Sequence, residues 1–545
     1  MLKDITPKQQ QRINEIFQSM SLADKIGQVQ CVNASALSAD EIRRLIDEEH
    51  IGAFFGGNIE KEKLKAIWEA AKDSKIPVII NGDLVNGAGS RIFGLTGFPQ
   101  QMGCSSADDE ELLYEMGKIT ATEGAAFGAK WTFGPVIDLC YNIQNPMMHI
   151  RTAGDRVEQV LKVGKAYMHG VQDTGYMAAT AKHFPGDGYD SRDTHITTLV
   201  NGSTREEWES TYGKIWRGMI EEGVMSVMSG HIALPFIDPE YEDESQRYKG
   251  MRPASLSKKI LLGFLRGELN FKGTIVTDAV NMIGLGAHMK REAYAPRLLD
   301  AGNDMLLWTK PEIDRPAMQK ALEDGSLTME RLDDAVMHIL ELKARVGLLD
   351  ETPVYPVVTE QDIEENKKKA QQMADKSICV LRDVFHAIPM KQLKPGDRVL
   401  TISMTFVEGV RNKRDGNDLT VIDDMLRERG FVVDHMVNPD GIGTLSKIKD
   451  DYQAIFVNFK YPAKYGSIRL CGDAISALKG SWWVEDPKVV FTAFGDPFKI
   501  YDLPSLHSYI ATFSVREVSQ RAAVKVWLGE LEAQGHCPVQ MEKYL

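Results

Sequence analysis

Short apolar runs that alternate with helical patterns limit the fold of residues 1–346 more than any other feature of the sequence. Buried parallel strands appear as continuous apolar runs, because helices cover both faces of a parallel sheet. Runs of this kind lie at 28–32, 52–56, 77–81, 131–138, 178–183, 224–230, 273–278 and 304–308. Each is followed by enough chain for a helix, so this repeat predicts an α/β fold, with a (β/α)8 TIM-like barrel favoured. A doubly wound open sheet is the second interpretation.

A break that contains two prolines separates this region from a smaller one. The segment LLDETPVYPVV carries Pro353 and Pro356, which end the helical periodicity. Residues 364–381 are then predicted to form one helix. Further strand patterns follow near 398–404, 431–436, 452–459, 488–495 and 508–513. We therefore predict three parts: a barrel domain at 1–346, a linker at 347–370, and a three-layer α/β/α sandwich domain at 371–545.

Two predicted helix starts carry a capping signal, in which a serine precedes a glutamate by three residues. Ser38 with Glu41 and Ser203 with Glu206 both fit this pattern. In such a box, the serine side chain accepts a hydrogen bond from the third helical N–H. We expect both serines to cap the helices that follow them.

The charge balance limits the partners that the protein is expected to bind, and the cysteines indicate the cellular compartment. The chain has 64 basic and 77 acidic residues and no basic stripe, so nucleic acid and anionic membranes are not expected partners. Its 6 cysteines show no paired or CxxC spacing, which favours reduced thiols. The N-terminus carries no apolar signal segment, and no apolar window reaches the length of a membrane span. We predict a cytoplasmic protein.

Polar side chains follow the predicted strands at the ends where barrel enzymes bind their substrates. In a (β/α)8 barrel, catalytic groups lie at the C-terminal ends of the strands. The polar residues at these ends, and in the loops behind them, are Asp83, Arg91, Asp138, Arg151, Lys182, His183, His231 and Asp278. Packing alone does not account for so many charged and imidazole groups on one rim. We predict that this rim is an active site.

Asp278 ends the apolar run GTIVTD. A lone carboxylate is costly to bury unless hydrogen-bond donors surround it. A carboxylate aimed into a barrel mouth is therefore a candidate nucleophile or general base. The alternative is that Asp278 caps the helix that follows it.

The loop KHFPGDGYDSRDTH is the densest polar stretch in the chain, and it places Asp193 two residues before His195. In an extended segment, residues two apart lie on one face. An aspartate beside a histidine orients the ring and raises its pKa, which makes a proton donor near neutral pH. Two alternatives are a metal site built from Asp187, Asp190, Asp193 and His195 and a plain solvated loop.

Other catalytic classes lack their motifs in this sequence. No GxxxxGK[ST], GxSxG or HExxH is present, and the glycines at 284 and 286 lack the third glycine of a dinucleotide fingerprint. We therefore predict no bound cofactor and no resident metal.

The segments KHFPGDG, DTH, VMSGHI and GTIVTDAVNM together resemble glycoside hydrolase family 3. The resemblance is to the two-domain branch of bacterial β-N-acetylglucosaminidases and β-glycoside phosphorylases with an Asp-His dyad. It implies that Asp278 is a covalent nucleophile and that His195 is the acid/base, oriented by Asp193. It also implies that Asp83, Arg91, Arg151, Lys182 and His183 bind the sugar, and we add His231 from its place at a strand end.

One segment departs from the family pattern. The branch usually reads Asp-x-Glu-Gly-Gly before its arginine, whereas this chain has Asp83-Leu-Val-Asn-Gly-Ala-Gly-Ser-Arg91. The end residues are kept and the acid between them is absent. The resemblance therefore implies N-acetylglucosamine as the sugar, with glucose as a competitor.

Together, the residues and the resemblance predict a retaining, exo-acting enzyme that cleaves a small β-linked sugar through a glycosyl-enzyme on Asp278. We predict inorganic phosphate, as a co-substrate, to be favoured slightly over water as the acceptor. A histidine that has given up its proton is neutral and repels an anion less than a carboxylate does. Hydrolysis by water is the alternative, and a non-catalytic sugar-binding protein is a further one. The sequence leaves the aglycone and the oligomeric state open.

Overall fold

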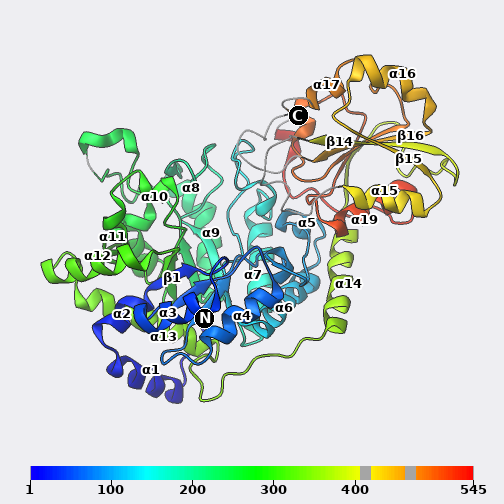
Figure 1. The fold of residues 1–545 in the computed structure, drawn as a ribbon. Helices are drawn as coiled ribbons and strands as arrows, with labels where there is room; N and C mark the ends of the chain where they lie inside the picture. The colour runs from blue at the N-terminus through cyan, green and yellow to red at the C-terminus, as the bar shows by residue number, and fades with distance from the viewer. Residues whose placement is uncertain (1, 243, 406–418, 461–469, 471–473, 544–545) are drawn as a thin grey trace. The chain divides into compact units, whose positions relative to one another are not determined.

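The computed structural model describes residues 2–242, 244–405, 419–460, 470 and 474–543. The chain forms two compact units (Figure 1). The first contains Met1–Gly97, Glu110–Asn142 and Val160–Asn366, and the second contains Phe98–Asp109, Ile143–Gln159 and Lys367–Leu545. Of the cysteines, Cys471 lies outside the described ranges, and the others are thiols.

A parallel sheet of eight strands forms the core of the first unit. The strands are β1 (Gln30–Asn33), β2 (Ala53–Phe55), β4 (Ile79–Gly82), β6 (Ala129–Thr132), β7 (Ala178–Phe184), β9 (Ser226–Ser229), β11 (Thr274–Thr277) and β12 (Leu306–Leu307). They are hydrogen-bonded in the order β11-β9-β7-β6-β4-β2-β1-β12. A parallel bridge between Val276 and Met305 joins the two ends of this order, so the sheet curls into a barrel. The barrel prediction is confirmed, and the open sheet is wrong because of this bridge.

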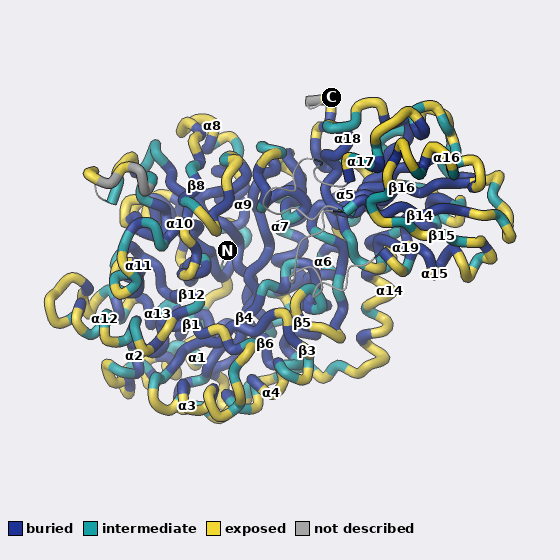
Figure 2. The backbone as a smooth tube through the Cα atoms, turned by 45° about the horizontal axis from the view of Figure 1, so that its top comes forward, coloured by how far each residue is buried: buried dark blue, intermediate teal, exposed yellow. Residues whose placement is uncertain are grey.

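Helices surround the barrel of the first unit (Figure 1). They are α1 (Pro7–Ser19), α2 (Leu22–Gln28), α3 (Ala39–Glu49), α4 (Lys61–Ala71), α6 (Glu110–Ala126), α7 (Val157–Gln172), α8 (Arg205–Ser210), α9 (Tyr212–Glu221), η5 (Lys259–Glu268), α10 (Ile283–Gly286), α11 (Tyr294–Ala301), α12 (Pro311–Asp324) and α13 (Met329–Arg345). The strands are buried, whereas the outer faces of the helices are exposed (Figure 2). In the described part of the chain, no helix has both the length and the apolar character needed to cross a bilayer.

The two capping predictions have different outcomes. Ser38 caps α3 in a capping box with Glu41, as predicted. The second prediction is wrong by one residue, because Thr204 accepts the N–H of Glu207 and caps α8. Ser203 instead donates its hydroxyl to Asn201 Oδ1 at 2.6 Å.

The second unit contains a six-stranded sheet with helices on both faces (Figure 1). Its strands are β13 (Cys379–Asp383), β14 (Arg398–Thr405), β15 (Val432–Val437), β16 (Ala454–Lys460), β17 (Val489–Ala493) and β18 (Ser508–Ala511), in the order β13-β18-β17-β16-β14-β15. The helices α15 (Thr420–Glu428) and α19 (Glu517–Leu528) lie on one face, and α16 (Ser446–Ile448) and α17 (Ala474–Leu478) lie on the other. This is the predicted three-layer sandwich.

The edge strand β13 replaces the end of a predicted helix. The helix α14 (Glu360–Ser377) stops before Cys379, so the prediction of one helix over 364–381 is wrong at its C-terminal end. Residues 379–383 pair with β18 in antiparallel orientation. This pairing across the fold overrides the local helical pattern.

The compact units are interleaved along the chain, unlike the predicted division into 1–346, 347–370 and 371–545. Two early segments belong to the second unit because their contacts lie there. Ser106 donates its hydroxyl to Ser377 O at 2.8 Å, and the backbone N–H of Gln540 donates to Asp155 Oδ2 at 3.1 Å. The change of unit after Asn366 falls within α14 rather than in an extended linker.

Candidate active site

Asp278 follows β11 at the C-terminal end of the barrel. Its backbone N–H donates to Ser229 O at 2.9 Å, and the N–H of Ala279 donates to Asp278 Oδ1 at 2.7 Å. Burial acts to raise the pKa of Asp278, but the nearby His183, the Ala279 N–H and the Lys182 ammonium outweigh it. The pKa of Asp278 is therefore lowered, and the side chain is an anion at neutral pH.

The end of β7 supplies Lys182 and His183, and both are held by acids from the segments that follow β4 and β6. Lys182 Nζ donates to Asp83 Oδ1 at 2.6 Å. His183 Nδ1 lies 2.7 Å from Asp138 Oδ2, and the backbone N–H of His183 donates to the same carboxylate. Asp138 is fully buried, so it fixes the ring of His183.

The dyad predicted from the DTH segment is formed. His195 Nδ1 lies 2.7 Å from Asp193 Oδ1, and the His195 N–H donates to the same oxygen at 2.8 Å. The Asp193 side chain is 3% exposed and the His195 side chain is 54% exposed. A buried acid thus orients the imidazole ring of an exposed histidine, which suits a proton donor.

His231 follows β9 and has its own fixed tautomer. The hydroxyl of Ser255 lies 2.9 Å from His231 Nδ1, and His231 Nε2 lies 3.1 Å from Ala279 O. A carbonyl accepts only, so Nε2 carries the proton and Nδ1 accepts from Ser255. Burial lowers the pKa of His231, so the ring is neutral and holds the turn after Asp278.

Arg91 and Arg151, which were considered from the sequence, and Arg192 in the dyad loop lie in different surroundings. Arg91 is exposed and donates to Asn58 Oδ1 at 3.2 Å. Arg192 is paired with Asp190, so its positive charge is already neutralised by that carboxylate. Arg151 belongs to the second unit, where its Nη1 donates to Met147 O at 3.2 Å. The structure therefore brings together Asp83, Lys182, His183, Asp193, His195, His231 and Asp278 within the first unit.

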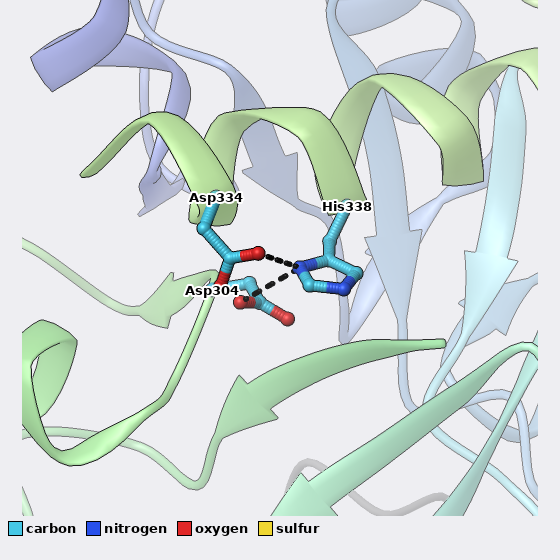
Figure 3. Close-up of side chains that lie close together, drawn as sticks. All are labelled: Asp304, Asp334 and His338. Atoms are coloured by element: carbon cyan, nitrogen blue, oxygen red, sulfur yellow. Dashed lines mark ion pairs between the residues drawn. The ribbon is translucent and has the colours of Figure 1, made fainter. Parts of the chain in front are cut away.

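The loop acids do not form a metal cluster among the described residues. Asp190 accepts hydrogen bonds from Arg192 and from the Val200 N–H. The group that does gather ligand atoms is Asp304, Asp334 and His338 (Figure 3). Asp304 also accepts from two guanidinium groups, those of Arg266 and Arg331, at 2.6 and 2.7 Å. Because these cations already neutralise it, the cluster fits an ion-pair network better than a cation site.

Several residues that shape the site were not found from the sequence. Ser255 lies 24 residues from the histidine that it contacts, and no motif marks it. Trp308 follows β12 with a left-handed φ of 67° and packs edge-on against Phe55, with ring centroids 5.4 Å apart. A bulky residue in this region is uncommon and is a feature of functional sites. The run DMLLW at 304–308 carries no sequence signal for this conformation.

The arrangement supplies the groups that glycosyl transfer requires. One ionised carboxylate, Asp278, stands at a strand end beside positive charge. A histidine with an aspartate partner stands on a loop whose backbone is bonded to the segment after that strand, through Ile283 N to His195 O at 3.3 Å. A nucleophile and a separate proton donor suit a double displacement.

Comparisons with known proteins agree with this chemistry. Residues 21–342 match the family described as "Glycosyl hydrolase family 3 N terminal domain". A relative from Cellulomonas fimi, named β-N-acetylglucosaminidase/β-glucosidase, is 27% identical over 95% of this chain and 93% of its own. The solved structure of the β-glucoside phosphorylase BglX bound to 2FGlc has a TM-score of 0.87 at 29% identity, covering 98% of this chain and 97% of that one.

A further solved structure is the family 3 β-N-acetylglucosaminidase from Paenibacillus sp. str. FPU-7. It has a TM-score of 0.82 at 25% identity, and the match covers 96% of this chain and 99% of that one. These three matches each cover 95% or more of the chain and therefore include most of both units. The chain therefore belongs to glycosyl hydrolase family 3 and is an enzyme of the β-glycosidase type.

Proposed function

We propose that the protein is a retaining, exo-acting enzyme that transfers a β-glucosyl or β-N-acetylglucosaminyl residue to inorganic phosphate. The observation that carries the proposal is the Asp193–His195 pair, on a loop bonded to the segment that follows Asp278. In the first step, Asp278 attacks the anomeric carbon while His195 protonates the leaving oxygen. In the second step, the acceptor oxygen attacks the anomeric carbon, Asp278 leaves as a carboxylate, and the acceptor's proton passes to His195.

Sugar binding is assigned to the polar groups around the nucleophile. Asp83 and Lys182 form an ion pair at a strand end, and His183 is fixed by a buried acid, so these groups are already ordered before substrate binds. Arg91 completes the proposed set, whereas both ring nitrogens of His231 are already bonded within the protein. The Cellulomonas relative is named for both sugars, which supports a site able to accept either.

The choice of phosphate as acceptor follows from where the negative charge lies after the first step. A carboxylate acid/base would carry that charge on the atom facing the acceptor, and at ~4 Å the repulsion of another anion is about 4 kcal/mol at an effective dielectric of 20. Here the charge stays on Asp193, which is buried behind the neutral His195 ring. Phosphate also needs less help from a base than water does. A cytoplasmic location, proposed from the sequence, would supply phosphate.

Hydrolysis is the second candidate, since the relatives from Cellulomonas and Paenibacillus carry the names of hydrolases. Turnover of an aryl β-glucoside and an aryl β-N-acetylglucosaminide in millimolar phosphate, followed by phosphorus NMR, separates the two. We expect a sugar 1-phosphate signal and a rate that rises with phosphate. Free sugar alone, at a rate indifferent to phosphate, would reject the phosphorylase.

The mechanism has its own test. A 2-fluoro glycoside should label Asp278, and Asp278→Ala should lower activity by about 10⁴-fold or more. Asp47→Ala, which changes an exposed acid on α3, is the matched control and should keep full activity. A product of inverted anomeric configuration would end the retaining hypothesis.

A further inference from the structure

The loop that carries the acid/base dyad is docked on α10, the helix that follows the nucleophile. The backbone N–H of Gly284 donates to Thr194 O at 3.1 Å, and the N–H of Ile283 donates to His195 O at 3.3 Å. Thr194 and His195 are neighbours in the dyad segment. One short stretch of chain, from Asp278 to α10, thus contacts both parts of the reaction centre.

A side-chain contact strengthens the same docking. Thr198 Oγ1 donates to Gly284 O at 2.8 Å, and it lies 2.6 Å from His288 Nε2. A hydroxyl has one proton, and here the Gly284 carbonyl takes it, so His288 must donate from Nε2. Thr198 and His288 are both buried, which shields these bonds from water.

At Gly284 the helix lies directly against the loop backbone. A Cβ at this position would lie 2.7 Å from Thr194 O and 3.0 Å from Thr197 O. The φ of Gly284 is outside the left-handed region, so the helix itself would accept alanine there. The absence of a side chain is therefore required by the loop and not by the helix.

We propose that Gly284, Thr198 and His288 are positioning residues that hold His195 at a fixed place relative to Asp278. The inference rests on the proposed roles of His195 and Asp278. None of the three residues takes part in the chemistry. Their work is to keep the proton donor within reach of the leaving oxygen, where a misplacement of about 1 Å costs about 100-fold in rate.

The first test uses Gly284→Ala, with Gly286→Ala as the matched control. Both change a glycine of α10 to alanine, but a Cβ at Gly286 would meet only the hydroxyl of Tyr294, the far end of a side chain. The readout is kcat/KM on aryl β-glycosides whose leaving groups range from dinitrophenol to poor phenols. For G284A we expect a fall of about 10- to 100-fold on poor leaving groups and less than about 3-fold on dinitrophenyl glycosides. G286A should stay within about 2-fold on all of them.

Two further pairs of variants test the side-chain contact between Thr198 and His288. Thr198→Val removes the hydroxyl and should show the same selective loss, whereas Thr198→Ser keeps it and should restore the rates. His288→Phe removes the donor, and His288→Gln supplies one again. A residue needed only for folding would change all substrates alike and would not be rescued selectively.

The variant His195→Ala distinguishes a failure of the positioning role from a failure of the proposed function. If H195A shows the leaving-group dependence and G284A and T198V lose activity equally on all substrates, or lose none, the positioning role is overturned. If H195A itself shows no dependence on the leaving group, His195 is not the acid/base and the proposed function fails first.

Discussion

At the scale of the residue, Lys343 shows how a buried cation is tolerated outside the active site. It lies on α13, is fully buried, and donates to Gln28 Oε1 at 2.6 Å. No carboxylate lies within ion-pair distance of it among the described residues. Burial lowers its pKa to about 7, so the ammonium readily gives up its proton in the folded state.

The sign of the resulting pH dependence follows from the two pKa values. The unfolded chain has a lysine pKa near 10.4, so between about pH 7 and pH 10 the unfolded state binds more protons than the folded state. Stability therefore rises with pH across this window, by on the order of 4 kcal/mol from this group. We predict that Lys343→Met raises the free energy of unfolding at pH 7 and loses its advantage by about pH 10.

Urea unfolding of wild type and K343M at several pH values measures this difference. The unpaired Gln28 oxygen left behind costs about 1–3 kcal/mol, so the net gain at pH 7 is expected to be about 1–3 kcal/mol. Lys320→Met, an exposed site on α12, is the control. A difference between K343M and wild type that does not change with pH would contradict the prediction.

Sequence reasoning at this scale succeeded where partners are close along the chain. Asp193 and His195 are two residues apart, so their pairing follows from local geometry alone. Asp138 and His183 are 45 residues apart, and only the curl of the sheet brings them together. Each residue could be placed at a strand end, but the hydrogen bond between them could not be predicted.

At the scale of the element, α6 and α7 cross at a contact that only glycine permits. A Cβ on Gly170 would lie 2.0 Å from Tyr114 O and 3.0 Å from Gly117 Cα. We predict that Gly170→Ala lowers the free energy of unfolding by about 1–3 kcal/mol, because the helices must move apart. Gly263→Ala is the matched control, since its Cβ would meet nothing nearer than 3.9 Å. Chemical denaturation measures both, and equal stability of the two variants would disprove the crossing constraint.

The strands were predictable because continuous apolar runs reflect burial on both faces. The strand β13 was not, since its residues continue a helical pattern and its pairing with β18 comes from a distant segment. The positions of Asp278 and of the Asp193–His195 pair followed from strand ends and motifs. The docking of α10 on the dyad loop could not be predicted. It depends on the path of two loops in space, and loops show no periodic sequence pattern.

At the scale of the whole molecule, the second unit depends on segments from the barrel half of the chain. His149 is fully buried there and packs edge-on against Phe498, with ring centroids 5.2 Å apart. We predict that a chain truncated to residues 1–346 exposes the segments 98–109 and 143–159. Stronger binding of a hydrophobic dye and rapid hydrogen exchange in both segments should show it, with the full chain as control. A truncated chain with native exchange protection there would refute the prediction.

This interleaving has a consequence for synthesis on the ribosome. The segment that ends at Gln159 emerges long before the strands and helices of Lys367–Leu545 that it packs with. At about 5–20 residues per second, the delay until the last residue is roughly 20 to 80 seconds. The barrel repeats can fold during that time. In the early segments, side chains such as Phe98 and Met148, which are buried in the complete protein, stay exposed to solvent. The nascent chain therefore exposes apolar surface until the C-terminal strands and helices of the second unit have been made.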